Sequence, residues 1–87
     1  MRLKDEFLLR EIAGSWVVVP IGERVVQMNS ILSLNESGAL LWEKLSAGAQ
    51  PEDLVQCLTD TYEVTRGEAE IDVEKFVNIL NEKGLLE

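Results

Sequence analysis

The segment that decides the fold spans residues 34–45 and reads Leu34-Asn35-Glu36-Ser37-Gly38-Ala39-Leu40-Leu41-Trp42-Glu43-Lys44-Leu45. It begins like a capped helix, because Asn35 is a good N-cap and the pair of Ser33 and Glu36 has capping-box spacing. The sequence leaves open which of the two residues caps the helix. Behind the cap, apolar residues recur at the helical period, namely Leu41, Trp42 and Leu45. The segment therefore predicts a helix over residues 35–46, with Trp42 as its buried anchor.

The residues before this segment have the composition of short strands. Strands are predicted over residues 7–12, 16–20 and 24–28, with turns at Gly14-Ser15 and Gly22-Glu23 between them. The second strand is the clearest, because it is aromatic and then β-branched, and Pro20 ends it by lacking a backbone donor. Together these strands predict a three-stranded antiparallel meander.

Two more helices are predicted after residue 46. Pro51 is suited to the first position of a helix over residues 51–62. A capping box formed by Thr65 and Glu68 opens a longer helix over residues 66–83, and Gly84 ends it. The order βββααα predicts an α+β, winged-helix-like fold, and a chain of 87 residues has room for one domain, residues 1–87, around one core.

Negative charge is concentrated in the helical part of the chain. The net charge is −8 at pH 7, and the segment from Leu32 onward holds twelve Asp or Glu residues against four Lys or Arg residues. Binding to nucleic acid requires cations that neutralise phosphates, and an acidic surface also repels anionic membranes. We therefore expect no nucleic-acid or membrane partner. A DNA-binding, transcription-associated module remains the less favoured alternative that the winged-helix-like fold suggests.

The residues that usually carry catalysis are scarce. The chain contains no histidine and a single cysteine, Cys57, so it offers no Cys-His pair, zinc ribbon or internal disulfide. Cys57 lies between apolar residues at helical spacing, and we expect it to be a small buried hydrophobe. The sequence thus predicts no enzyme, no metal and no cofactor. The lone cysteine and the lack of a signal-peptide pattern favour the cytoplasm.

The third predicted strand is an edge of the meander and carries no protection against pairing. Residues 25–28, Val25-Val26-Gln27-Met28, include no charge and no proline. An open edge of this kind can accept a strand from another polypeptide. The alternatives are that helices cover this edge, or that the protein is an adaptor or a homodimer that pairs through it. Monomer and dimer both stay open.

The whole pattern resembles the PqqD-like family of peptide chaperones, also known as RiPP precursor recognition elements. The resemblance extends from about Phe7 to Leu86, and its most specific part is the helix start at residues 34–39. Further matching features are Val17-Val18-Val19-Pro20, Trp42, Leu45, Tyr62-Glu63-Val64, Asp72-Val73, Phe76, Leu80 and Gly84-Leu85-Leu86.

This resemblance implies a non-catalytic function. Family members bind the leader segment of a ribosomally synthesised precursor peptide and present its core to a modifying enzyme, often a radical SAM maturase. The leader adds to the third strand and lies against the third helix. On this chain the implied peptide-binding residues are Arg24, Val25, Val26, Gln27, Met28 and Asn29 on the strand, and Asp72, Lys75, Phe76 and Ile79 on the helix.

Two of these helix residues have distinct expected roles. Lys75 is the best candidate for a contact with an acidic side chain of the leader, whereas Phe76 also continues the inner apolar stripe and is expected in the core. Leaders of this family are often acidic, and so is the helical part of this chain. The sequence does not decide which charge the leader carries.

Overall fold

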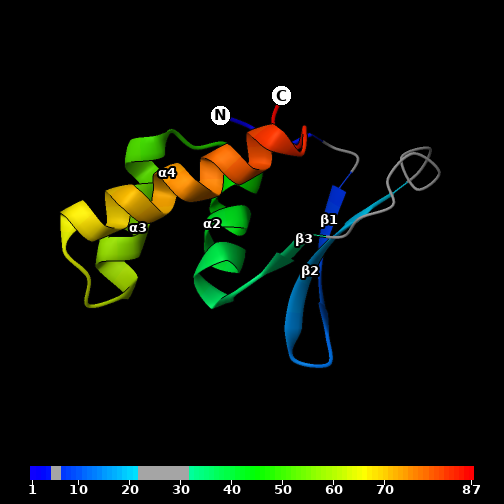
Figure 1. The fold of residues 1–87 in the computed structure, drawn as a ribbon, viewed down its shortest axis with the longest axis horizontal. Helices are drawn as coiled ribbons and strands as arrows, with labels where there is room; N and C mark the ends of the chain where they lie inside the picture. The colour runs from blue at the N-terminus through cyan, green and yellow to red at the C-terminus, as the bar shows by residue number, and fades with distance from the viewer. Residues whose placement is uncertain (5–6, 22–31) are drawn as a thin grey trace.

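The computed structural model describes residues 1–4, 7–21 and 32–87. In these residues a sheet of antiparallel strands is followed by helices, as Figure 1 shows. The elements are β1 (Phe7–Ile12), β2 (Ser15–Pro20), β3 (Leu32–Leu34), α2 (Glu36–Ser46), α3 (Pro51–Thr61) and α4 (Arg66–Glu82). This arrangement confirms the predicted α+β, βββααα fold class. Each helix differs from its predicted range by one residue at one end.

The turn between β1 and β2 lies one residue earlier than predicted. Ile12 pairs with Ser15, so the two loop residues are Ala13 and Gly14 rather than Gly14 and Ser15. Both adopt positive φ, 52° and 82° respectively. Two consecutive positive φ angles are typical of a type I′ turn, whose twist matches the twist of the flanking strands. Ala13 adopts this conformation, so that Ser15 is the first residue of β2 and not a turn residue.

The third strand of the described sheet is Leu32–Leu34, which pairs antiparallel with β2 through Trp16↔Leu34, Val17↔Ser33 and Val18↔Leu32. The strand order is β1-β2-β3, so β3 is an edge of the described sheet. The predicted strand at residues 24–28 lies outside the described residues. Leu34 was expected at the helix start, whereas in the structure it is the last residue of β3.

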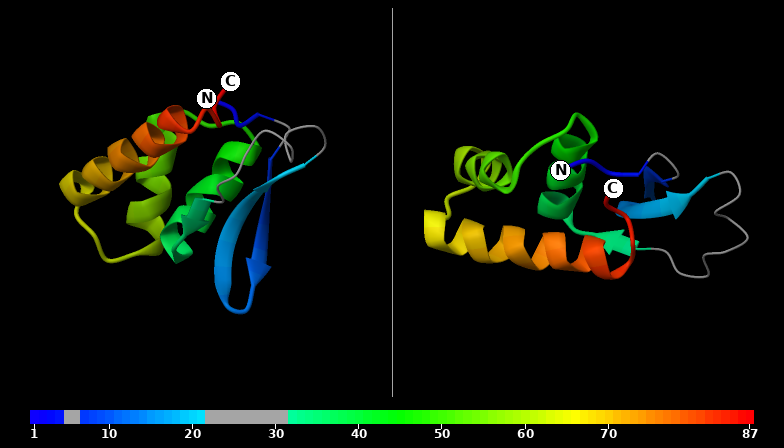
Figure 2. Two further views of the ribbon diagram at one scale, coloured as in Figure 1. Left: turned by 45° about the vertical axis from the view of Figure 1, so that its right-hand side comes forward. Right: turned by 90° about the horizontal axis from the view of Figure 1, so that it is seen from above.

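The core lies between the helices and the inner face of the sheet. Its largest fully buried side chains come from α2, α3, α4 and the C-terminal segment, and they are Leu45, Leu54, Leu80 and Leu85. Trp42 is 3% exposed, which confirms it as a core residue. Cys57 is only partly buried and packs against this core. Figure 2 shows α2 between the β1–β2 hairpin and α3, with α4 running along one side.

The two chain ends lie side by side. Leu3 and Leu86 form an antiparallel bridge. On either side of it the N–H of Lys4 donates to the carbonyl of Leu85 at 2.9 Å, and the N–H of Glu87 donates to the carbonyl of Arg2 at 3.0 Å. The N and C labels of Figure 1 accordingly lie close together.

Candidate functional site

The junction between β3 and α2 forms one wall of the candidate site. Asn35 is the N-cap of α2: its Oδ1 atom accepts from the backbone N–H of Gly38 at 2.8 Å and from Oγ of Ser37 at 3.0 Å. This answers the question that the sequence left open, because Asn35 caps the helix while Ser33 belongs to β3. The cap fixes the angle at which the strand enters the helix.

Gly38 allows the strand to lie close to the first turn of α2. A Cβ atom added to Gly38 would lie 3.1 Å from Oδ1 of Asn35 and 3.3 Å from Cβ of Leu34. Both separations are tighter than an ordinary van der Waals contact. The close packing therefore explains why a glycine, which has no side chain, occupies the last position of the Leu-Asn-Glu-Ser-Gly segment. This segment forms the wall of the site.

A groove of about 320 Å³ runs between this wall and one flank of α4. We call it the β3–α4 groove. Its lining comes from β3, α2, α3 and α4, and consists of Ser33, Leu34, Asn35, Ser37, Gly38, Leu41, Leu58, Asp72, Lys75, Phe76 and Ile79. The floor is apolar and the rim carries hydroxyl, amide and charged groups. Such a surface can hold an extended peptide with alternating apolar and polar side chains.

All four helix residues that the sequence predicts to bind the peptide line this groove. Asp72, Lys75 and Ile79 are exposed on its rim, and Ile79 keeps 41% of its surface accessible although it is apolar. Phe76 is 7% exposed, so it belongs to the core while one side of it faces the groove. The six strand residues, Arg24 to Asn29, lie outside the described residues.

The strand side of the groove was not predicted from the sequence. Ser33 and Leu34 line it together with α4, and Leu41 and Leu58 contribute to its floor. A signal was present, since Leu32 and Leu34 flank a polar residue in the alternation typical of a strand. The stronger capping pattern that begins at Ser33 obscured it.

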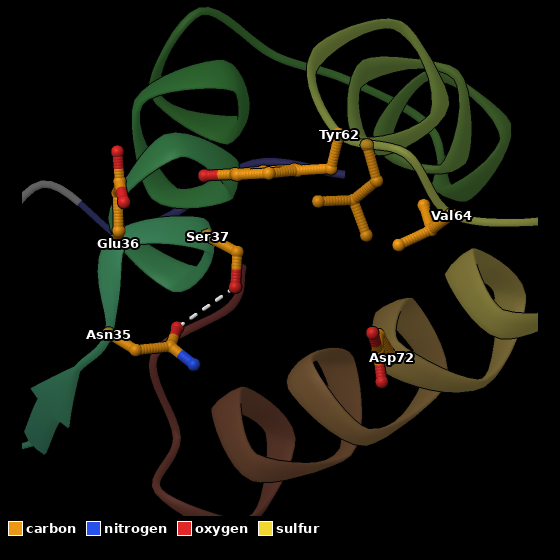
Figure 3. Close-up of a pocket in the computed structure, with 7 residues that line it drawn as sticks. Asn35, Glu36, Ser37, Tyr62, Val64 and Asp72 are labelled. Carbon is orange, nitrogen blue, oxygen red and sulfur yellow. Dashed lines mark hydrogen bonds between the residues drawn. The ribbon is translucent and has the colours of Figure 1, made fainter.

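A second hollow of about 320 Å³ adjoins the groove and shares Asn35, Ser37, Leu58 and Asp72 with it. We call it the Tyr62 pocket. The residues that line only this pocket are Glu36, Tyr62 and Val64. Figure 3 shows Asp72 on α4 facing the first turn of α2, with the Tyr62 ring across the top. The hydroxyl end of Tyr62 points toward α2.

The environment of Tyr62 favours the neutral form of its phenol. Partial burial raises the pKa of Tyr62 above its usual value of 10.0, and electrostatic interactions with Glu36 and then Cys57 raise this pKa further. Tyr62 is an uncharged hydrogen-bonding group at physiological pH, since even the usual pKa of 10.0 lies well above that pH.

Neither a metal centre nor a membrane-spanning helix is found in the part of the chain that the structure describes. No group of three or more His, Cys, Asp or Glu side chains there is arranged to hold a metal ion. None of the helices described is both long enough and apolar enough to cross a bilayer.

The fold and the groove define a class of small α+β domains in which a sheet edge and a helix flank line one groove. The chain belongs to the PqqD family, described as coenzyme PQQ synthesis protein D, whose family model matches residues 15–86. The resemblance drawn from the sequence is thereby confirmed.

Two solved structures are similar to this chain over nearly their whole length. One is TbiB1 in complex with the TbiA(beta) leader peptide: it is 28% identical, the match covers 100% of this chain and 95% of that one, and the TM-score is 0.80. The other is lasso peptide synthetase B1 complexed with the leader peptide: it is 32% identical, with 97% and 93% of the two chains covered and a TM-score of 0.76. No curated protein matches this chain.

Proposed function

We propose that this protein binds the leader segment of a ribosomally synthesised precursor peptide in the β3–α4 groove. One observation carries the proposal: a sheet edge and a helix flank with both apolar and charged side chains line the same groove. Membership of the PqqD family supports it, as do two similar structures that are themselves complexes with leader peptides.

The strand side of the groove supplies backbone hydrogen bonds. β3 pairs with β2 on one side only within the described sheet, so its other edge can pair with an incoming strand. In an antiparallel pair, alternate residues direct their N–H and C=O groups to opposite sides. The bound leader would thus pair with every second residue. We propose that residues Arg24 to Asn29 also contact the leader.

The helix side supplies side-chain selectivity. Leu34, Leu41 and Phe76 form an apolar floor that fits an apolar leader side chain, and Ile79 offers further apolar surface at the rim. Lys75 forms no ion pair with the described residues, where the ion pairs join Arg66 to Glu52 and Glu70. Lys75 is therefore available to an acidic leader side chain, as predicted from the sequence.

In this proposal the protein acts in the cytoplasm as a carrier rather than as an enzyme. Its role is to deliver the precursor to a modifying enzyme, for which a radical SAM maturase is one candidate. The name of one structural neighbour, a lasso peptide synthetase, makes an enzyme of lasso peptide synthesis a second candidate. The absence of histidine and the presence of one cysteine support a role without catalysis.

The direct test is an amide chemical-shift titration of the isotope-labelled protein with synthetic peptides from the short reading frames that neighbour its gene. We expect one peptide to shift resonances at residues 32–38 and 72–79, and also at residues 24–29. A folded protein whose groove resonances respond to no such peptide would contradict the proposal. It would favour an adaptor or homodimer that pairs through the sheet edge, which light scattering over a range of concentrations would detect.

A further inference from the structure

The surface of the proposed leader site is electrically uneven. Lys75 lines the β3–α4 groove but not the Tyr62 pocket, whose lining holds two carboxylates, Glu36 and Asp72, and no Lys or Arg. Glu36 and Asp72 come from different helices, α2 and α4. Neither carboxylate forms an ion pair within residues 1–4, 7–21 and 32–87. One end of the site is therefore acidic, although a cation lies one turn of α4 away.

The N-terminus of α2 opposes this negative charge only in part. A helix N-terminus carries the equivalent of about half a positive charge, whereas the two carboxylates carry two full negative charges. The N-terminal N–H of Gly38 is already bonded to Asn35, whose Oδ1 also accepts from Ser37. A positively charged ligand group is thus favoured in the Tyr62 pocket, and an anion is not.

The shape and polarity of the Tyr62 pocket suit a long basic side chain. Its lining combines apolar groups, namely Leu58, Val64 and the ring of Tyr62, with the carboxylates of Glu36 and Asp72. Lys and Arg bury an aliphatic stem against apolar surface and keep the charged head at a polar rim. An aromatic face also attracts an ammonium or guanidinium group. Neutral Tyr62 offers its hydroxyl oxygen as a further acceptor.

We propose that the Tyr62 pocket selects leader peptides that carry a Lys or Arg side chain beside the segment that fills the β3–α4 groove. This inference rests on the proposed function and names the charge of one leader position. An acidic leader residue at Lys75 and a basic one in the Tyr62 pocket are compatible, because Lys75 lines only the groove and Glu36 lines only the pocket, while Asp72 lines both.

The test uses a phage-displayed library of random peptides selected in parallel on three proteins. These are the wild type, the Glu36→Gln/Asp72→Asn variant, and a Glu74→Gln/Glu82→Gln control that loses the same charge from exposed positions of α4 outside the pocket. We expect the wild type and the control to enrich Lys or Arg at one fixed spacing from an apolar position. The pocket variant should lose this enrichment and keep the apolar one. A peptide with that residue should bind the pocket variant about two- to fivefold more weakly, as for an exposed ion pair.

Two other outcomes are distinguishable. Peptides that share apolar positions and shift the groove resonances, but show no basic enrichment or keep it with the pocket variant, would overturn this inference and leave the proposed function standing. Selected peptides that leave the groove resonances unchanged would overturn the proposed function, and the inference with it.

Discussion

The Oδ1 atom of Asn35 accepts a hydrogen bond from the backbone N–H of Gly38 at 2.8 Å, and this contact joins β3 to α2 where the candidate site begins. Asn35→Ala removes the cap and should lower the free energy of unfolding by about 0.5–2 kcal/mol. Asn35→Asp keeps an acceptor at the helix N-terminus and should retain most of the stability. Urea denaturation measures both variants, and equal losses of stability would show that the side-chain acceptor at residue 35 is not what stabilises the start of α2.

Gly38 and Gly67 form a matched pair of helical glycines. A methyl group on Gly67 would meet only Oγ1 of Thr65 at 4.0 Å, whereas one on Gly38 would crowd Asn35 and Leu34. Gly67→Ala should therefore raise the free energy of unfolding by up to about 1 kcal/mol through helix propensity. Gly38→Ala should raise the free energy of unfolding by less than Gly67→Ala does, or should lower it. Thermal unfolding compares them, and an equal gain in both would disprove the crowding.

Ile79 and Leu80 are neighbours in sequence with different surroundings. Leu80 is fully buried, so Leu80→Ala should lower the free energy of unfolding by about 2–5 kcal/mol. Ile79 is 41% exposed on the groove rim, and Ile79→Ala should change stability by no more than about 0.5 kcal/mol. Its effect should instead appear as about 1 kcal/mol of lost leader affinity in calorimetry. Unchanged affinity would remove Ile79 from the site.

Proline substitutions test strand addition. At an outward-facing backbone position a proline removes one donor to the leader and leaves the sheet intact. We therefore expect at least one proline among positions 25–28 or 32–34 to abolish leader binding while circular dichroism still shows a folded protein. In β3, the backbone groups of Ser33 point to one side of the strand, and those of Leu32 and Leu34 point to the other. Proline on the side that faces the leader should lower the leader affinity, whereas proline on the side that pairs with β2 should disrupt the sheet. Wild-type affinity in every folded variant would exclude pairing through this edge.

Tyr62 should make stability depend on pH at high pH. The unfolded phenol titrates near pH 10.0 and the folded one at a higher pKa. Between these two values the unfolded chain has lost the proton while the folded chain keeps it. The free energy of unfolding should therefore fall as the pH rises through this window, with no contribution from Tyr62 below it. Tyr62→Phe should abolish this part of the decline.

The titration of Tyr62 can also be observed directly. The chain contains one tyrosine, so the ultraviolet absorbance of tyrosinate reports this residue alone. A midpoint at the usual value in the folded protein would contradict the raised pKa.

Local patterns in the sequence were sufficient to predict the helices. Pro51 at a helix start and the Thr65–Glu68 capping box act within one turn, and the structure contains both. The flank formed by Asp72, Lys75, Phe76 and Ile79 follows from helical spacing, and these residues do line one groove. Their role in binding stays a prediction.

The strand side of the site was harder to predict because strand pairing depends on distant residues. The residues that follow Leu34 in the sequence predict a helix start, and Leu34 belongs to a strand only because it pairs with the distant residue Trp16. The hairpin turn was displaced because sequence alone favours Gly14 as the first turn residue, whereas Ala13 also adopts positive φ. The Tyr62 pocket was missed because its walls come from three separate segments.

The bridge between Leu3 and Leu86 gives both chain ends a common exit point on the surface. A second protein joined genetically to either end would be tethered at nearly the same place. The tether length, rather than the choice of end, would then set the effective concentration at which the two proteins meet.

The proximity of the two chain ends also makes the domain suitable for circular permutation, in which a short linker joins the old ends and new ends open at the Ala13–Gly14 turn.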